Sequence, residues 1–485
     1  MMVMRVLLFF ILVPVLALGQ KKNRSSLMEQ WKSTADSGIQ TRYNQYKDIA
    51  FAIWDYAELG YKEEKSSSLL QQTLKENGFE IESGIAGIPT AFVASYGSGG
   101  PVLGILAEFD ALPGLSQYAL PEKKPIEGRI SGHGCGHHLF GTASVAAAIQ
   151  VKELMLQHNW KGTIKVFGTP AEEGGSGKVY MVRAGVFNGV DAVLHWHPSD
   201  ENTTWADGAL ANKSAKFRFY GTAAHAAAAP EKGRSSLDAV EAMNHMVNMM
   251  REHIPADAKI HYVITQGGKA PNVVPDFAEV YYYVRHPNRE LVMQLFERIR
   301  KAAEGAAIGT ETRSDFEIIG GTYDLLLNKH LAEIMQANLL RIGGVNYSRE
   351  EEEFAQKIQS SFGYATDPLE SARSVKPIKI NSGKTTGSTD VGDVSYTVPT
   401  VGLRAATWIP GTPAHSWQAV ACGGTEIGIK GMMVASKTIA LTLIDLLHDP
   451  TALQKARIEF DSARGTGFTY TPLLGDRSPA LNYRD

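Results

Sequence analysis

The segment Gly132–Gly141 carries residue types that bind transition metals, because it holds three histidines and a cysteine between residues 133 and 138. Cys135 and His137 are two positions apart, so in an extended chain their side chains can lie on the same side. A thiolate and an imidazole suit Zn²⁺ or a similar divalent ion, and the surrounding glycines let the backbone approach an ion closely. A glycine-rich turn that merely contains histidines is the alternative, but the density of ligand types favours a metal site.

Two adjacent carboxylates, Glu172 and Glu173, lie in a loop shaped by glycine and proline just after an apolar segment at 163–167. A solvated surface pair is the ordinary interpretation of such neighbours. On an extended backbone, however, adjacent side chains point in opposite directions. One carboxylate can therefore bind a metal ion while the other addresses water or substrate.

Further histidines follow the next predicted strands. His195 and His197 come after the apolar residues 192–194, where alternation puts both on one side of the chain. A single histidine at such a position is more often a packed or capping residue. His415 lies in a glycine- and proline-rich loop after another predicted strand and is a further candidate ligand.

The candidate ligands from separate strand ends are too many for one closed tetrahedral site. They are Cys135, His137, one of Glu172 and Glu173, one or both of His195 and His197, and His415. This set fits two divalent ions, Zn²⁺ or Mn²⁺, that share a bridging carboxylate and water. A structural zinc site is the alternative, and it would have four ligands and no open position.

These residues need a scaffold that brings strand ends together, and the sequence predicts one. Apolar strands at 102–107, 163–167 and 192–194 alternate with helical patterns, of which 141–158 is rich in alanine. Such alternation is typical of an α/β domain with a mixed, mostly parallel sheet. Sites in such domains form beyond the carboxyl ends of the strands, where the candidate residues lie.

Residues 212–319 show a different pattern, in the order β-α-β-β-α-β, which is typical of a ferredoxin-like α+β domain. The α/β pattern resumes afterwards, so we expect one domain split by an insert, with hinge motion near 205–215 and 318–323. The expected division is a signal peptide at 1–19, a first catalytic part at 24–211, the insert at 212–319, a second catalytic part at 320–450 and a tail without strong signal at 451–485.

Composition excludes several classes of protein. The chain has 485 residues, 44% of them apolar, and a formal net charge of -3, which gives no electrostatic case for nucleic-acid binding. The first 19 residues combine Arg5, a short apolar run and the small residues Ala17 and Gly19, and they predict a signal peptide and a periplasmic or secreted protein. An uncleaved anchor is the alternative, and the mature chain is not expected to span a membrane. Cys422 is expected to be buried and free.

Taken together, these motifs resemble the M20 family of metallopeptidases and amidohydrolases. The segments that carry the resemblance are 107–113, 132–141, 170–174, the insert and 411–416, and it covers roughly residues 30–450. Within the family, the segment at 270–287 is most similar to a branch that acts on p-aminobenzoyl-glutamate. The resemblance implies an α/β metallopeptidase domain with a mixed, mostly parallel sheet and an inserted ferredoxin-like lid and dimerisation domain.

The resemblance also implies a role for each matching residue. The metal ligands fall on Cys135, His137, Glu173, His197 and His415, with His197 preferred over His195. Glu172 is implied to be the general base, and Asp110 to orient a ligating histidine. His225 in the lid is implied to stabilise the oxyanion, often in the neighbouring subunit. Asn272 and Arg285 are implied to hold a substrate carboxylate.

The implied function is hydrolysis of the amide bond of an N-acyl amino acid by a metal-activated water, with Glu172 as general base and p-aminobenzoyl-glutamate as the leading analogy. The expected assembly is a homodimer through the lid, with a possible paired subunit. The alternatives are a dipeptidase or aminoacylase of other specificity and an exported, non-catalytic binding protein on the same fold. The roles of His138 and His195 stay open at this stage.

Overall fold

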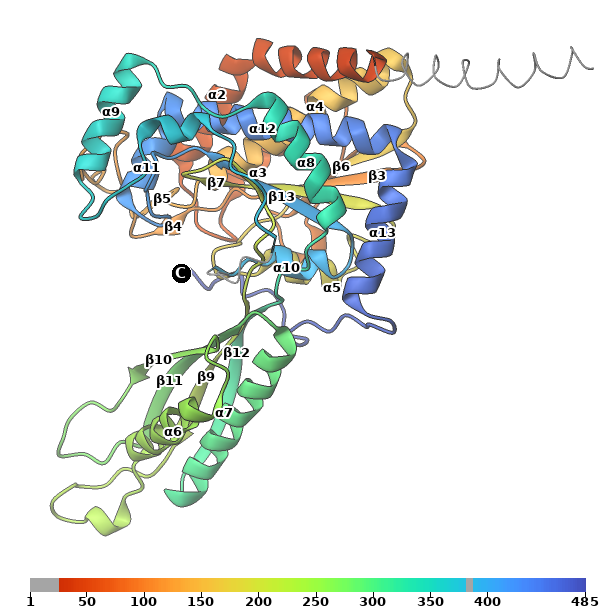
Figure 1. The fold of residues 1–485 in the computed structure, drawn as a ribbon. Coiled ribbons are helices and arrows are strands. Elements are labelled where there is room, and N and C mark those ends of the chain that lie inside the picture. Colours follow the sequence, from red (N-terminus) through yellow and green to blue (C-terminus); the bar gives the residue numbers. More distant parts are fainter. Residues whose placement is uncertain (1–25, 381–386) are drawn as a thin grey trace, which may run out of the picture.

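The computed structural model describes residues 26–380 and 387–485. They form an α/β domain and a smaller domain that extends away from it (Figure 1). The predicted signal peptide at 1–19 lies outside the described residues, so export stays a prediction.

The larger domain is built on a seven-stranded sheet in the order β1-β2-β6-β3-β7-β13-β8. Its strands are β1 (Glu80–Ser83), β2 (Phe92–Ser98), β3 (Val102–Ala107), β6 (Gly162–Gly168), β7 (Ala192–Ser199), β8 (Thr203–Trp205) and β13 (Thr400–Ala406). The four central strands β6, β3, β7 and β13 are parallel, and the outer strands pair antiparallel. The predicted α/β class with a mixed, mostly parallel sheet is confirmed.

Helices cover both faces of this sheet. They include α2 (Tyr43–Tyr56), α3 (Glu64–Glu76), α4 (His137–His158), α5 (Gly177–Arg183), α8 (Lys329–Ile342), α9 (Arg349–Ser360), α10 (Val391–Ser395), α11 (Trp417–Gly423), α12 (Glu426–His448) and α13 (Pro450–Arg464). Helices α2, α4 and α12 lie on one side, whereas α5 and α10 lie on the side that faces the smaller domain (Figure 1).

Two of these helices, α4 and α12, are long and apolar enough to cross a membrane among the residues that the structure describes. Most of each helix is buried inside the protein. A helix that is apolar on all sides is typical of a domain core, and α4 and α12 pack against each other there. Helix α4 begins at His137, four residues earlier than the predicted start at Gly141, so its first turn belongs to the candidate metal motif.

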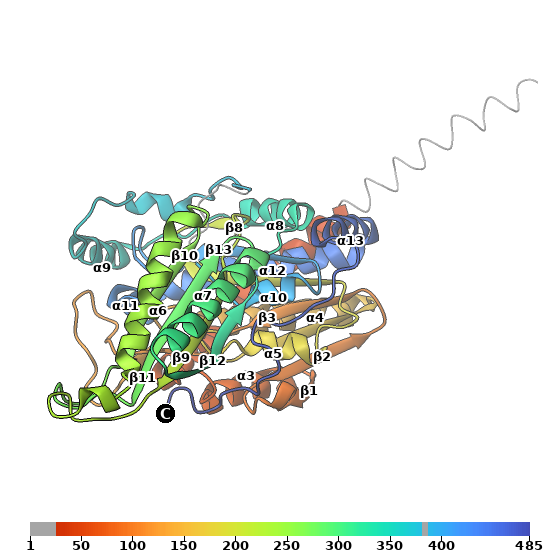
Figure 2. The ribbon, with the colours of Figure 1, turned by 90° about the horizontal axis from the view of Figure 1, so that it is seen from below.

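The smaller domain, called the lid below, spans residues 211–322. Its elements are β9 (Ala211–Tyr220), α6 (Ser236–Met250), β10 (Lys259–Gln266), β11 (Phe277–His286), α7 (Arg289–Gly309) and β12 (Arg313–Thr322). The strands form an antiparallel sheet in the order β10-β11-β9-β12, and both helices lie on one of its faces (Figure 2). Alternate residues of β9 and β11, such as Phe217 and Val280, point into the small core beneath those helices.

The chain crosses between the two domains at the start of β9 and the end of β12. Asn212 donates a hydrogen bond to the Thr322 hydroxyl at 2.8 Å, which ties the two crossing strands together. Both positions fall within the segments where hinge motion is expected.

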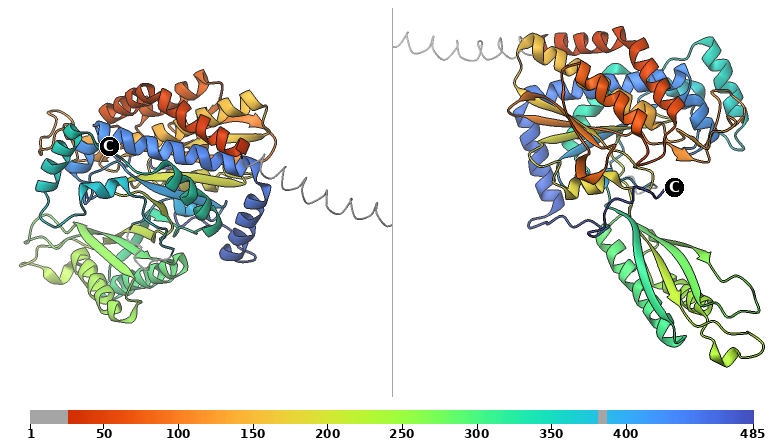
Figure 3. Two further views of the ribbon diagram at one scale, coloured as in Figure 1. Left: turned by 45° about the horizontal axis from the view of Figure 1, so that its top comes forward. Right: turned by 180° about the vertical axis from the view of Figure 1, so that it is seen from behind.

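The tail was expected to carry no strong signal, and in the structure it begins with a helix. Residues 450–464 form α13, and 465–485 return past the hinge toward the larger domain (Figure 3). A start signal was present in the sequence, because Asp449 caps the helix with its side chain and Pro450 occupies the first helical position.

Candidate metal centre

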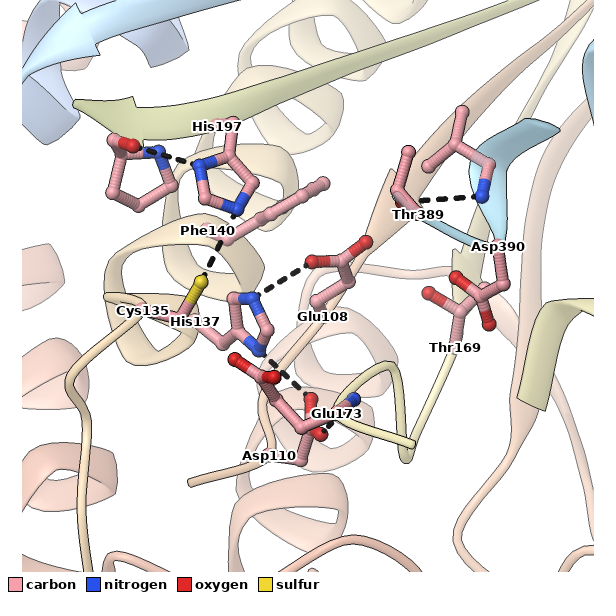
Figure 4. Close-up of polar contacts among 12 residues, drawn as sticks. Glu108, Asp110, Cys135, His137, Phe140, Thr169, Glu173, His197, Thr389 and Asp390 are labelled. Carbon is pink, nitrogen blue, oxygen red and sulfur yellow. Dashed lines mark hydrogen bonds and ion pairs between the residues drawn. The ribbon is translucent and has the colours of Figure 1, made fainter. Parts of the chain in front are cut away.

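The candidate ligands come together near the carboxyl ends of the parallel strands, and Figure 4 shows four of them, Cys135, His137, Glu173 and His197. Glu173 and His415 lie in the loops after β6 and β13, and His197 lies within β7. Cys135 directly precedes the N-cap of α4, and His137 is the first residue of that helix. This is the edge at which sites form in open α/β sheets.

Three sets of side chains have ligand atoms that all lie within 4.8 Å of one another. The first set is Cys135, His137 and His197; the second is Cys135, Glu173 and His415; the third is His137, Glu172 and Glu173. All five predicted ligands occur in these sets, together with Glu172. No other such set occurs in residues 26–380 and 387–485.

The spacing of the ligand atoms fits a small divalent ion. Cys135 Sγ lies 3.4 Å from His197 Nε2, and Glu173 Oε1 lies 3.1 Å from His415 Nε2. Tetrahedral ligands with bonds of about 2.0–2.3 Å stand about 3.3–3.8 Å apart. Thiolate, imidazole and carboxylate donors are also the types that Zn²⁺ accepts.

The first two sets together contain all five predicted ligands, and Cys135 is the residue that they share. Two ions held by these sets would share the Cys135 thiolate, whereas Glu173 is the carboxylate that the second and third sets share. The backbone here is left-handed, because Gly136 has a φ of +78° and caps α4. The chain is not extended here, so simple alternation does not set the directions of Cys135 and His137.

Glycines in this motif let loops approach one another rather than an ion. A Cβ atom at Gly136 would lie 2.7 Å from the Pro198 side chain, next to the ligand His197. A Cβ atom at Gly134 would crowd Leu115, and the Gly134 carbonyl accepts a hydrogen bond from the His415 backbone at 2.9 Å. The motif thereby fixes the loops that carry two of the other ligands.

Asp110 connects ligands of two different sets. Its Oδ1 lies 2.8 Å from His137 Nδ1, and its Oδ2 accepts a hydrogen bond from the Glu173 backbone at 2.9 Å. A hydrogen bond at Nδ1 leaves Nε2 of the imidazole as the atom that can bind metal. Burial alone would raise the pKa of Asp110, but the charge and hydrogen bond of His137 hold it below its usual value.

A buried charge cluster behind the ligands was not predicted from the sequence. Glu108 Oε2 lies 3.1 Å from His137 Nε2, and the fully buried Lys178 contacts Glu108 at 2.7 Å and Asp390 at 2.8 Å. Burial would lower the pKa of Lys178, but the two carboxylates raise it, so the lysine is charged. In the sequence, the position of Glu108, two residues before Asp110, was the available indication of this cluster. No recognisable spacing relates Lys178 or Asp390 to the predicted ligands.

The electrostatics of the centre favour a bound cation. Burial raises the pKa of the Cys135 thiol well above its usual value, and the neighbouring Glu173 raises it further. Burial also raises the pKa of Glu172, with added repulsion from Glu108 and Glu173. Burial lowers the pKa of His197, which keeps its imidazole neutral. Positive charge at this point would stabilise the thiolate and carboxylates.

The centre opens into a cavity of about 640 Å³ between the two domains. Its lining includes Cys135, Glu172, Glu173, His197 and His415 from the centre, Asn212, Tyr283 and Arg285 from the lid, and Trp205, Arg404, Trp408 and Arg484 from elsewhere in the chain. The resemblance implies that Asn272 and Arg285 hold a substrate carboxylate. Of these two residues, Arg285 lines the cavity of its own chain.

His225 and Asn272 lie at the other end of the lid. The Ala226 backbone donates to the Asn272 carbonyl at 3.0 Å, so the loops that carry the two residues are neighbours. Strand β11 begins at Phe277, shortly after Asn272. A rise of about 3.3 Å per residue along the strand places Phe277 about 26 Å from Arg285. His225 and Asn272 do not line the cavity of their own chain.

The two histidines with open roles lie outside the ligand sets. His138 Nε2 lies 3.0 Å from the Gly423 carbonyl. His195 is buried against Gly402 and the Trp205 ring, and burial lowers its pKa to about 3. Both are packed core histidines, and Cys422 is buried and free as expected.

Comparisons with known proteins found similar sequences and folds. The peptidase dimerisation domain family matches residues 211–311. The chain is 38% identical to one of the subunits of the p-aminobenzoyl-glutamate hydrolase of Escherichia coli K12, over 92% of this chain and 98% of that protein. It is 28% identical to the Xaa-Arg dipeptidase of Mus musculus over 89% of this chain and 93% of that protein. Its fold is similar to a Bacillus subtilis structure described as a dinuclear metal-binding peptidase, with a TM-score of 0.58, 19% identity and coverage of 84% of this chain and 99% of that one.

Proposed function

The chain belongs to the M20 family of metallopeptidases and is a hydrolase of amide bonds, and from this premise we propose that it cleaves N-acyl amino acids related to p-aminobenzoyl-glutamate. The observation that carries the proposal is the pair of ligand sets that share Cys135, with Glu172 beside them. A non-catalytic binding protein would need the ligands but not the additional half-buried carboxylate of Glu172.

Two divalent ions held by the sets would polarise the amide carbonyl and supply an activated water. We propose that Zn²⁺ or Mn²⁺ fills both positions. Glu172 accepts the proton that the attacking water loses and returns it to the leaving amine. Burial and the neighbouring Glu108 and Glu173 raise the pKa of Glu172, which makes its carboxylate a stronger base than that of an ordinary glutamate.

We assign the substrate carboxylate to Arg285. Its guanidinium lines the cavity and lies over the Tyr283 ring, 5.3 Å from the centroid. It forms no ion pair with a carboxylate among the described residues. An arginine stacked on an aromatic ring and left without an acid is a ready site for a carboxylate.

The assembly that we propose is a dimer through the lid, formed by two copies of this chain or by this chain and a related subunit. Strand β10 is an unpaired edge of the lid sheet, and its apolar residues Tyr262, Val263 and Ile264 are exposed. Exposed apolar edge strands pair readily with another chain. In such a dimer, His225 and Asn272 would complete the partner's site, which explains their distance from their own.

The test is turnover by the purified, metal-loaded protein of p-aminobenzoyl-glutamate, other N-acyl amino acids and an Xaa-Arg dipeptide. We expect cleavage of p-aminobenzoyl-glutamate at the amide bond and loss of it after chelation. Preferred cleavage of the dipeptide would favour the second candidate, a dipeptidase, which the mouse relative suggests. Binding of these compounds without cleavage of any would contradict the proposed activity.

We also propose that the protein is exported, on the strength of the signal-peptide pattern at 1–19. Sequencing the mature N-terminus tests this, because a chain that keeps Met1 has not been processed.

A further inference from the structure

The segment 465–485 runs from the end of α13 past the base of the lid (Figure 3), and hydrogen bonds hold it at several points along this path. Near its start, Tyr470 donates to Asp393 Oδ1 at 2.7 Å. In the middle, the Leu473 carbonyl accepts from Lys213 of β9 at 2.8 Å, and Arg477 donates to the Ile319 carbonyl of β12 at 2.7 Å. The segment thus binds both strands of the hinge before it reaches the centre.

Two glycines leave room for this segment. A Cβ atom at Gly321 would lie 2.7 Å from the Cβ of Leu473, which is buried. A Cβ atom at Gly60 would lie 2.2 Å from the Tyr483 hydroxyl. The fold therefore has space at Gly60 and Gly321 that side chains of the segment fill. This packing specifies the course of the segment.

At the centre, the segment contacts the loop that carries the two carboxylates. The Tyr483 hydroxyl donates to the Glu173 carbonyl at 3.1 Å, and an Arg484 Nη2 hydrogen bond reaches the same oxygen. Arg484 also lines the cavity beside Glu172, Glu173 and Cys135. A guanidinium is thereby placed next to the reacting groups.

The guanidinium of Arg484 has N–H donors that its contacts within the described residues do not use. It forms no ion pair with a carboxylate in residues 26–380 and 387–485, and its buried Nε has no hydrogen-bond partner there. A guanidinium has five N–H donors arranged for bidentate binding of a carboxylate. By contrast, Arg404 in the same cavity is already paired with Asp207 at 3.4 Å and lies over Trp205.

The cavity therefore presents two guanidiniums without acids, Arg285 from the lid and Arg484 from the segment 465–485. We propose that Arg484 is a specificity-determining residue that binds a second carboxylate, so that the site selects amides of acidic amino acids. Arg285 holds the α-carboxylate and Arg484 holds the side-chain carboxylate. This inference rests on the proposed function and names its substrate class.

The experiment compares two substrates that differ by one charge, p-aminobenzoyl-glutamate and p-aminobenzoyl-glutamine, in the wild type and in Arg484→Met and Arg484→Lys. We expect the wild type to prefer the glutamate compound by about 10- to 100-fold in kcat/KM, as loss of one charge-assisted hydrogen-bonded pair implies. Arg484→Met should abolish this preference, mainly through a raised KM for the glutamate compound. Arg484→Lys should keep part of it, because the charge remains.

Tyr483→Phe is the matched control. It removes a hydrogen bond to the same Glu173 carbonyl without changing any charge, so it should alter turnover of both substrates together and leave their ratio as in the wild type. If Arg484→Met also lowers both substrates equally, Arg484 only positions the loop, and the proposal is overturned. A wild type without preference for the glutamate compound overturns it too.

Failure of the proposed function gives a different result, because the wild type would then cleave neither compound. In that case, calorimetric measurement of the binding of p-aminobenzoyl-glutamate and p-aminobenzoyl-glutamine still decides the role of Arg484. Tighter binding of the glutamate compound that is lost in Arg484→Met supports it, and equal binding refutes it.

Discussion

At the scale of single residues, the centre depends on one thiol that serves two ligand sets. Cys135 joins His137 and His197 on one side and Glu173 and His415 on the other. The types and spacing of these residues identified them as candidate ligands, whereas the choice of His197 over His195 and of Glu173 over Glu172 came from the family resemblance. The direction of Cys135 relative to His137 was not predictable, because the backbone at Gly136 between them is left-handed, and alternation along an extended chain does not apply there.

Glu172 provides the first prediction. Glu172→Gln keeps the shape of the side chain but cannot accept a proton, so kcat should fall by at least about 100-fold. Metal content should stay near that of the wild type, because neither set that contains Cys135 includes Glu172. Turnover and metal analysis on the same preparation check this, and a variant with near-normal turnover would refute Glu172 as the base.

At the scale of elements, the fold places the ends of the parallel strands at one edge of the sheet. The segment 465–485 forms hydrogen bonds with both strands of the hinge. Apolar runs predicted the strands β3 and β6 closely, because these strands are largely buried. The segment 465–485 has no periodic pattern, since each of its contacts is made by an individual side chain. Its approach to the centre could not be predicted for that reason.

Asp393, which anchors this segment through Tyr470, provides a prediction about pH. Burial raises the pKa of Asp393 to about 7, although hydrogen bonds from Tyr470 and the Tyr323 backbone oppose the shift. In the unfolded chain the group titrates near pH 4. Between these values the folded state binds more protons, so this residue lowers the free energy of unfolding as pH rises from about 4 to about 7.

Asp393→Asn removes the titration. The difference in unfolding free energy, variant minus wild type, should therefore increase between about pH 4 and pH 7, by at most about 4 kcal/mol, and stay constant above that. Urea unfolding of both proteins across this range measures the difference. A difference that is flat between pH 4 and pH 7 would show that Asp393 does not carry the shifted pKa.

At the scale of the whole molecule, the chain is a catalytic domain whose lid presents some functional residues to its own cavity and others away from it. The order β-α-β-β-α-β was enough to predict the inserted domain, because both lid helices and the two central strands β9 and β11 have a clear apolar face. The separation of Arg285 from His225 and Asn272 follows from the length of β11 and was not visible in the motifs alone.

Subunit complementation tests the assembly. Neither His225→Ala nor Glu172→Gln should be active alone, but a refolded equal mixture should recover about a quarter of wild-type activity, since half of the dimers are mixed and each has one intact site. Affinity capture through a tag on one variant, with mass spectrometry of the captured protein, confirms that mixed dimers have formed. Activity of His225→Ala on its own at the wild-type level would mean that the histidine serves no site.

The dinuclear centre is tested most directly by how metal binds at Cys135. A crystal structure of the metal-loaded protein, with anomalous diffraction to locate the ions, should show two peaks about 3.5–4 Å apart. Both should lie within about 2.3 Å of the Cys135 sulfur, one beside His137 and His197 and the other beside Glu173 and His415. A single ion, or two ions of which one lacks the thiolate, would contradict a dinuclear centre bridged by Cys135.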